Sequence, residues 1–87
     1  MRKLVFGNQF LKSAEKLDMK LKTKLKSSLD FLLRNPFHPT LHTKPLTGKL
    51  SGYYAFRLGK DYRVMFEFIS EETIYLLKVG NRKDIYR

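Results

Sequence analysis

The C-terminal part of the chain, residues 52–87, alternates between apolar and polar positions with a period of two residues. This alternation predicts three half-buried strands, separated by tight turns at residues 59–61 and 70–72. The first two strands place a set of apolar side chains on one face: Tyr54, Phe56, Leu58, Tyr62, Val64, Phe66 and Phe68. One face of a small sheet is therefore expected to pack against the rest of the chain.

The third strand is expected to continue this apolar face through Tyr75, Leu77 and Val79. Ile74 and Leu76 would then fall on the opposite face, which also receives three cations, Arg57, Arg63 and Lys78. Cations on a sheet face are usually solvated. Their role here depends on which other residues accompany them.

The N-terminal half is expected to begin with a short strand, residues 2–6. The spacing of the apolar residues after it predicts two amphipathic helices. Asn8 is a candidate cap for the first helix, and Asp18 for the second, because their side chains can accept bonds from free N–H groups. Asn35 and Pro36 end the second helix. The apolar helix positions are Phe10, Leu11, Ala14, Leu17, Leu21, Leu25, Leu29, Leu32 and Leu33.

These elements predict a single domain over residues 1–87, of the α+β class. The expected order is strand, helix, helix, strand, strand, strand, with a helical hairpin packed on a small, mostly antiparallel sheet. Nothing else in the chain is left to cover the second face of that sheet. We therefore expect a ligand to bind on the open, cation-bearing face.

The segment between the second helix and the sheet, residues 36–51, contains three prolines, a glycine and two histidines. A loop of this length in a small domain is usually functional or pinned by its own apolar residues. His38 and His42 lack a third metal ligand nearby, so no metal site is expected. His42 is a possible general base, although a loop histidine without a role is the more common case.

Eighteen Lys and Arg against eight Asp and Glu give a net charge of +10, which is typical of proteins that bind polyanions. Residues 1–44 carry +7 of this charge and residues 45–87 carry +3. The lysines of the second helix are compatible with binding to a membrane surface. The apolar stripe of that helix, however, contains only leucine before Phe31 and lacks the Trp and Phe of interfacial helices, which favours packing on a sheet. With no cysteine, signal peptide or membrane span, a cytoplasmic protein is expected.

The second half of the chain also contains short motifs in a fixed order. They are Pro45-Leu46-x-Gly48-x-Leu50-Ser51-Gly52-Tyr53, Phe56-Arg57-Leu58, Asp61-Tyr62-Arg63-Val64, Leu77-x-Val79-Gly80-x-Arg82 and Ile85-Tyr86. This series resembles the RelE/ParE superfamily, the toxins of toxin–antitoxin pairs. The predicted element order is also that of the superfamily, so the resemblance covers nearly the whole chain.

The resemblance implies one of two functions. RelE-like members are ribosome-dependent endoribonucleases that cut mRNA in the A site, whereas ParE-like members bind DNA gyrase and have no nuclease role. We favour a metal-independent mRNA endoribonuclease without a cofactor, because gyrase binding gives no chemical reason for the trio Arg63, Arg82 and Tyr86. A cognate antitoxin is the implied partner in either case, together with the ribosome and mRNA or, alternatively, DNA gyrase.

Carried over by position, the resemblance implies four catalytic residues. Arg63 and Arg57 would hold the scissile phosphate, because guanidinium groups stabilise the charge that develops when a 2′-hydroxyl attacks it. Arg82 would stabilise the transition state or assist the leaving 5′-oxygen. Tyr86 would stack on a base or help to transfer a proton.

Four lysines are expected to contact RNA around these catalytic residues: Lys49, Lys60, Lys78 and Lys83. An arginine does not ordinarily act as a general base, because it stays protonated. The candidates for that role are Lys60, Lys83, His42 and the ribosome itself.

Overall fold

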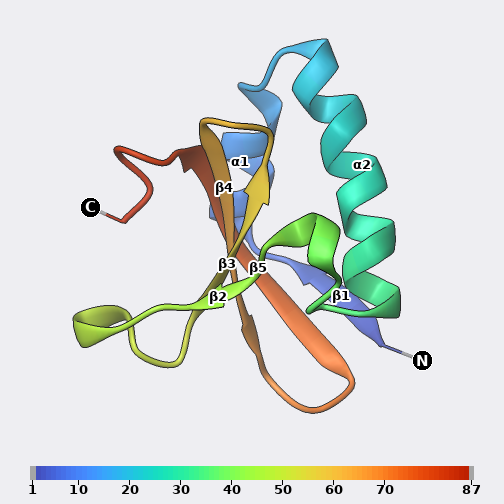
Figure 1. Ribbon diagram of the computed structural model, residues 1–87. Helices are drawn as coiled ribbons and strands as arrows, with labels where there is room; N and C mark the ends of the chain where they lie inside the picture. Colours follow the sequence, from blue (N-terminus) through green and yellow to red (C-terminus); the bar gives the residue numbers. More distant parts are fainter. Residues whose placement is uncertain (1, 87) are drawn as a thin grey trace.

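The computed structural model describes residues 2–86, and Figure 1 shows the course of this part of the chain. Its elements, in chain order, are β1 (Lys3–Phe6), α1 (Asn8–Glu15), α2 (Met19–Arg34), the 3₁₀ turn η1 (Pro39–Leu41), β2 (Lys44–Pro45), the 3₁₀ turn η2 (Gly48–Leu50), β3 (Tyr54–Leu58), β4 (Tyr62–Phe68) and β5 (Thr73–Asn81). The strands form one sheet in the order β1-β5-β4-β3-β2. β1 runs parallel to β5, and the other neighbouring pairs are antiparallel.

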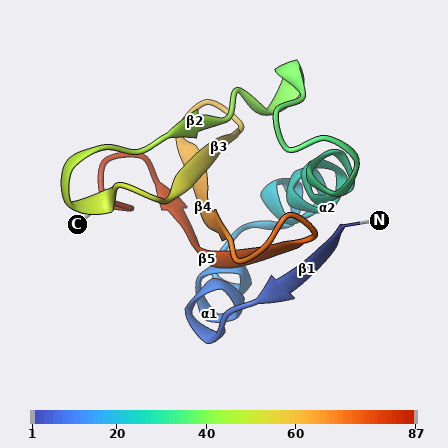
Figure 2. The same ribbon diagram turned by 90° about the horizontal axis from the view of Figure 1, so that it is seen from below.

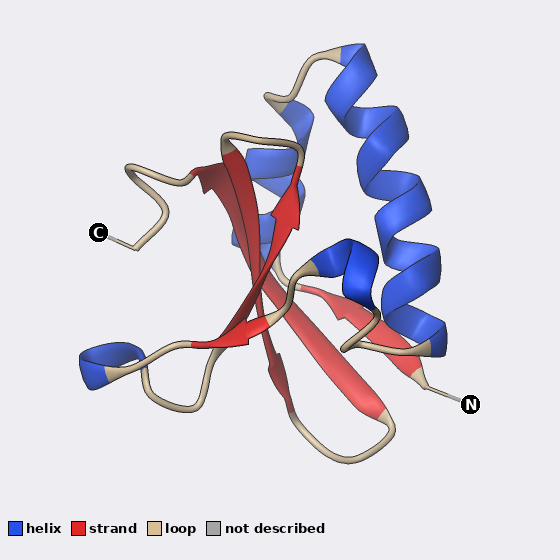
Figure 3. Cartoon of the chain, viewed as in Figure 1, coloured by secondary structure: helices blue, strands red, loops and turns tan. Residues whose placement is uncertain are grey.

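The α+β class and the order of the main elements are therefore confirmed. Figure 3 shows both helices beside the sheet. α1 contacts β5, and α2 contacts β3. Both helices and the three long strands contribute to one apolar core, whose buried members are Phe10, Leu17, Leu25, Leu32, Leu41, Phe56, Leu58, Val64, Phe66, Ile74, Leu76 and Val79. No helix within residues 2–86 is long and apolar enough to cross a membrane.

The helix ends agree with the sequence at α2 and differ at α1. The carboxylate of Asp18 accepts a hydrogen bond from the Leu21 N–H at 2.8 Å, which confirms the predicted cap of α2. The predicted cap of α1 is wrong, because Asn8 is already helical and Gly7 occupies the cap position without a side-chain bond. α1 is fastened to β5 instead, where the Ser13 hydroxyl accepts from the Val79 N–H at 3.0 Å.

The predicted face of the third long strand is wrong over part of its length. Ile74 and Leu76 of β5 are fully buried in the core, on the face that was expected to receive Tyr75 and Leu77. The cause is a β-bulge: Met65 pairs with Lys78 but Phe66 pairs with Leu76, so Leu77 is an extra residue. Because a bulge inserts one residue, it reverses the alternation after it. Val79 therefore still lies in the core, as predicted.

The second face of the sheet is partly covered by the end of the chain, which corrects the prediction that it is left open. Residues 82–86 turn back, held by the Asn81 carbonyl, which accepts from the N–H groups of Asp84 at 2.9 Å and Ile85 at 3.0 Å. Ile85 is 3% exposed, and Ala55 and Met65 on the second face are also buried. Figures 1 and 2 show the C-terminal tail and the η2 loop on the side of the sheet away from α2.

Gly7 marks a close approach of the chain to β5, and it provides a test of the packing. A Cβ atom at Gly7 would lie 2.6 Å from the Tyr75 hydroxyl and 2.9 Å from the Leu76 carbonyl oxygen. The second neighbour is backbone and cannot rotate away. Replacing Gly7 with alanine is therefore expected to lower the free energy of unfolding by about 1–3 kcal/mol, measured by urea denaturation.

Gly80→Ala is the matched control for this prediction. A Cβ atom at Gly80 would meet Ile85 Cβ at 3.9 Å, which is an ordinary van der Waals contact. The two variants should therefore differ clearly in their urea midpoints. Equal midpoints would mean that β1 and α1 do not approach β5 as closely as described.

Candidate active site

A pocket of about 250 Å³ opens on the second face of the sheet, between β2, β3, β4 and the tail. The side chains that can take part in chemistry there are His42, Lys44, Arg57, Arg63 and Tyr86. They come from the segment before the sheet, from two neighbouring strands and from the end of the chain. Residues far apart in sequence are therefore gathered at one place.

Arg57 and Arg63 provide the strongest electrostatic feature of the pocket. They are direct partners across the β3–β4 pair, on the face that carries Ala55 and Met65. Like charges placed opposite each other in a sheet destabilise it. An arrangement of this kind is best satisfied when an anion binds between the two guanidinium groups.

Arg63 is held in place by its own turn. One terminal nitrogen, Nη1, donates to the Tyr62 carbonyl at 2.8 Å and to the Lys60 carbonyl at 3.1 Å. Arg63 is half-buried, whereas Arg57 is exposed. The first guanidinium is therefore partly preorganised, because the turn already fixes one of its nitrogens.

The opposite wall of the pocket comes from the segment 36–51, which the sequence predicts to be irregular. Lys44 lies in β2 and pairs with Ala55. The next residue is a proline, which has no N–H to donate and is therefore found in edge strands such as β2. His42 has a φ of +50°, the one positive φ of a non-glycine residue within residues 2–86. Such a conformation is uncommon and concentrates at functional sites.

Tyr86 closes the pocket from the C-terminal tail and is 41% exposed. Burial raises the pKa of its phenol, and the positive charge of Arg63 lowers that pKa by a smaller amount. The net shift is upward from an ordinary value near 10. Tyr86 therefore keeps its proton at neutral pH and can donate a hydrogen bond.

This coupling predicts a titration result. Replacing Arg63 with methionine removes the charge that favours the tyrosinate, so the pKa of Tyr86 is expected to rise further. NMR of protein labelled at the tyrosine Cζ carbons would follow the titration, and Tyr86→Phe would assign the resonance among the five tyrosines. An unchanged Tyr86 pKa in Arg63→Met would show that the two side chains are not neighbours.

The other predicted catalytic residue, Arg82, does not line this pocket. Its backbone N–H donates to the Asp61 carbonyl at 2.7 Å, and its Nε lies 3.8 Å from Asp61 Oδ1. Both side chains of this ion pair are about half exposed, so the pair contributes little to stability. Arg82 thus lies at the β3–β4 turn rather than beside Arg57.

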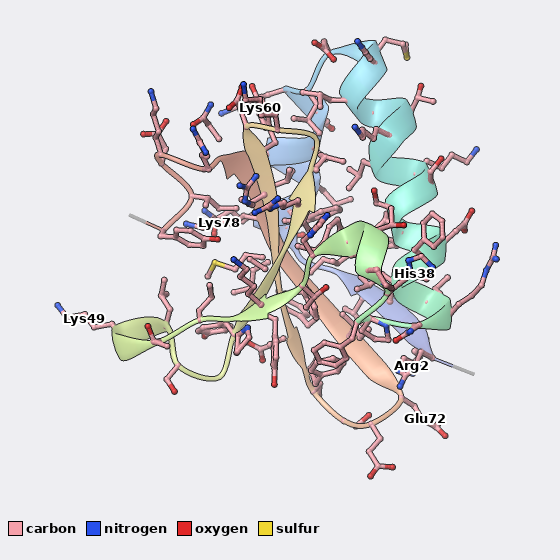
Figure 4. All side chains as sticks on the ribbon, in the orientation of Figure 1. Arg2, His38, Lys49, Lys60, Glu72 and Lys78 are labelled. Atoms are coloured by element: carbon pink, nitrogen blue, oxygen red, sulfur yellow. The ribbon has the colours of Figure 1, made fainter. Side chains whose placement is uncertain are left out.

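The predicted RNA-binding lysines are spread over the molecule. Lys60 is in the β3–β4 turn, and Figure 4 shows it at the end of the molecule far from Lys49 in η2. Lys78 is in β5 opposite Met65, and Lys83 is in the exposed tail, where its N–H donates to the side chain of Asn81 at 2.9 Å. The structure therefore brings Arg57, Arg63 and Tyr86 together, places Lys60 close by, and leaves Lys49 apart.

Lys44 was not among the predicted site residues, and His42 was predicted only as a candidate general base; both line the pocket. The only signal for either residue was the position of the loop directly before the paired strands. Within residues 2–86, no group of three or more His, Cys, Asp or Glu side chains is placed to hold a metal ion.

Comparison with known proteins decides the family. The family of the ParE toxin of the type II toxin–antitoxin system parDE matches residues 4–86. The chain belongs to this toxin family. The resemblance to the RelE/ParE superfamily is thereby confirmed. A search of curated protein sequences finds no significant match.

Solved structures of similar fold are also toxins. YafQ from Escherichia coli BL21(DE3) has a TM-score of 0.82 at 18% identity, with both chains covered completely. A YoeB/ParE toxin from Agrobacterium tumefaciens has a TM-score of 0.79 at 20% identity, covering 92% of this chain and 98% of its own. A chain of the RelBE2 toxin–antitoxin complex from Mycobacterium tuberculosis has a TM-score of 0.75 at 23% identity, covering 93% and 98% respectively. At these identities the likeness shows the fold.

Proposed function

We propose that this toxin is a ribosome-dependent, metal-independent endoribonuclease that cleaves mRNA in the cytoplasm. The observation that supports this most is the opposed pair Arg57 and Arg63 on a pocket closed by Tyr86. Two arginines that are cross-strand partners and line one pocket can bind a phosphate together, whereas their like charges disfavour the pairing in an empty sheet. Binding to a protein surface such as that of gyrase does not require two paired arginines beside a tyrosine.

The proposed reaction uses the RNA's own 2′-hydroxyl as the nucleophile. His42 accepts the proton of that hydroxyl, and the new bond from the 2′-oxygen to phosphorus forms as the bond to the 5′-oxygen breaks. Arg57 and Arg63 stabilise the extra negative charge on the phosphorane oxygens. The products are a 2′,3′-cyclic phosphate and a 5′-hydroxyl.

The leaving 5′-oxygen requires a hydrogen-bond or proton donor. Tyr86 supplies one, because its phenol is protonated at neutral pH and burial raises its pKa further. Its ring can also stack on a displaced base. Arg82 joins in only if its exposed pair with Asp61 opens, and such a pair costs little to break.

A cognate antitoxin is the proposed partner that controls this activity. The similar solved structures include two different toxin–antitoxin complexes, RelBE2 and DinJ-YafQ. An acidic or amphipathic segment of such a partner would fit the basic face that carries the pocket.

The family match also favours a second candidate, inhibition of DNA gyrase by protein binding, since the matching family is that of ParE. Translation in a cell-free extract with primer extension on the message separates the two functions. Cuts inside codons that require ribosomes support the nuclease. Intact message together with blocked supercoiling by purified gyrase would support the second candidate and contradict the first.

A further inference from the structure

Two more hollows continue from the active-site pocket toward the first half of α2. The nearer one is lined by His42 and Arg57, which also line the pocket, and by Lys24 and Lys60. The farther one is lined by the same two lysines and by Lys20. The pocket shares His42 and Arg57 with the nearer hollow, and the two hollows share Lys24, Gly59 and Lys60, so the three lie next to one another. We call the region lined by Lys20, Lys24 and Lys60 the basic groove.

The backbone explains why these lysines meet. Lys20 and Lys24 are four residues apart on α2 and therefore lie on the same side of the helix. Gly59, with a φ of +70°, turns the chain between β3 and β4, and a Cβ atom there would lie 3.9 Å from Lys24 Nζ. The turn thus brings Lys60 beside the helix, and Figure 4 shows Lys60 at the end of the molecule where α2 begins.

The excess of positive charge in the pocket and the groove is not found in every hollow on the surface of this basic protein. The pocket and the groove together are lined by six Lys and Arg residues and one carboxylate, Asp61, which is paired with Arg82: the six are Lys20, Lys24, Lys44, Arg57, Lys60 and Arg63. Two other hollows on the described surface are balanced instead. One is lined by Asp30 and Arg34, and the other by Lys16 and Asp84.

We propose that the basic groove binds the backbone of single-stranded RNA next to the phosphate held by Arg57 and Arg63. This inference rests on the proposed nuclease function and adds the path of the substrate. Lysines bind phosphates as point charges without reading sequence. The half-buried side chains of Leu21 and Tyr62 in the farther hollow offer an apolar surface for an unpaired base.

Binding of a twelve-nucleotide oligouridylate, followed by fluorescence anisotropy over a range of salt concentrations, tests the groove directly. The double variant Lys20→Met with Lys24→Met removes two phosphate contacts. Its slope of log affinity against log salt is expected to be smaller by about 1.4, since each single-strand contact contributes about 0.7. The matched control, Lys22→Met with Lys26→Met, loses the same charge from exposed α2 positions outside the groove.

Single-turnover cleavage of ribosome-bound mRNA separates the groove from the chemistry. The groove variant is expected to need about tenfold more toxin for half-maximal rate, with an unchanged maximal rate. If the wild-type protein cleaves no RNA, the proposed function fails, and the anisotropy experiment still decides whether the groove binds RNA.

Two outcomes would overturn the proposed groove. The first is an equal slope for the groove variant and its control. The second is a groove variant with unchanged cleavage kinetics that loses as much affinity for a twelve-residue oligoglutamate as for the oligouridylate. That result would identify the groove as a docking surface for an acidic peptide.

Discussion

Replacing Arg63 with alanine is expected to slow mRNA cleavage by about 10²–10³-fold, the effect of removing one preorganised group that stabilises developing charge. Arg63 is opposite Arg57 and beside Tyr86, and two carbonyl groups of its own turn hold its guanidinium. The loss should therefore appear in the maximal single-turnover rate on ribosome-bound mRNA. The affinity of the toxin for the ribosome should change much less.

Two further variants make this result specific. Arg63→Lys keeps the charge and loses the planar fork, so it should recover only part of the rate. Lys26→Ala removes an exposed charge from α2, outside the pocket and the groove, and should cleave at the wild-type rate. A wild-type maximal rate in Arg63→Ala, with a normal urea midpoint, would exclude Arg63 from the chemistry.

Phe66→Ala should lower the free energy of unfolding by about 3–5 kcal/mol, the cost of deleting a buried aromatic ring. Phe66 is 0% exposed in β4, and its ring lies 5.7 Å from Tyr54, 6.1 Å from Phe56 and 5.6 Å from Phe68 between centroids. A small domain has a total stability of roughly 5–15 kcal/mol. The variant is therefore expected to lose a large share of that stability, seen as a lower urea midpoint and a lower melting temperature by circular dichroism.

Phe37→Ala is the control that removes the same ring from the surface. Phe37 is 55% exposed and touches Tyr54 and Phe68 only at the edge of the aromatic cluster. Its loss should cost no more than about 1.5 kcal/mol. Similar costs for the two variants would mean that the aromatic core is not centred on β4.

Strong periodicity made most of the fold predictable. Asp18 and the leucine stripe located α2, and the alternation around Phe56 and Phe66 located β3 and β4 correctly. The faces of β5 were not predictable, because the bulge at Leu77 is a register shift that depends on its neighbour, β4. Nor did any local pattern show that Ile85 is buried, since an apolar residue near a chain end needs a partner surface to reveal its role.

The candidate site was predictable only in part. The family resemblance pointed to Arg57, Arg63 and Tyr86, which line one pocket, but not to Lys44, and only Lys60 of the basic groove was expected to contact RNA. These depend on a two-residue edge strand and on the approach of α2 to the Gly59 turn. Such contacts are tertiary, so they leave no periodic trace in the sequence. The ion pair between Arg82 and Asp61 could likewise not be predicted from the sequence.

The most direct test of the proposed chemistry is cleavage of a ribosome-bound mRNA with one 2′-deoxynucleotide at the mapped cut. If the 2′-hydroxyl is the nucleophile, that site is not cut, and the unmodified message yields fragments ending in a 2′,3′-cyclic phosphate. Equal cleavage of the deoxy-substituted message, with 5′-phosphate ends, would contradict the mechanism.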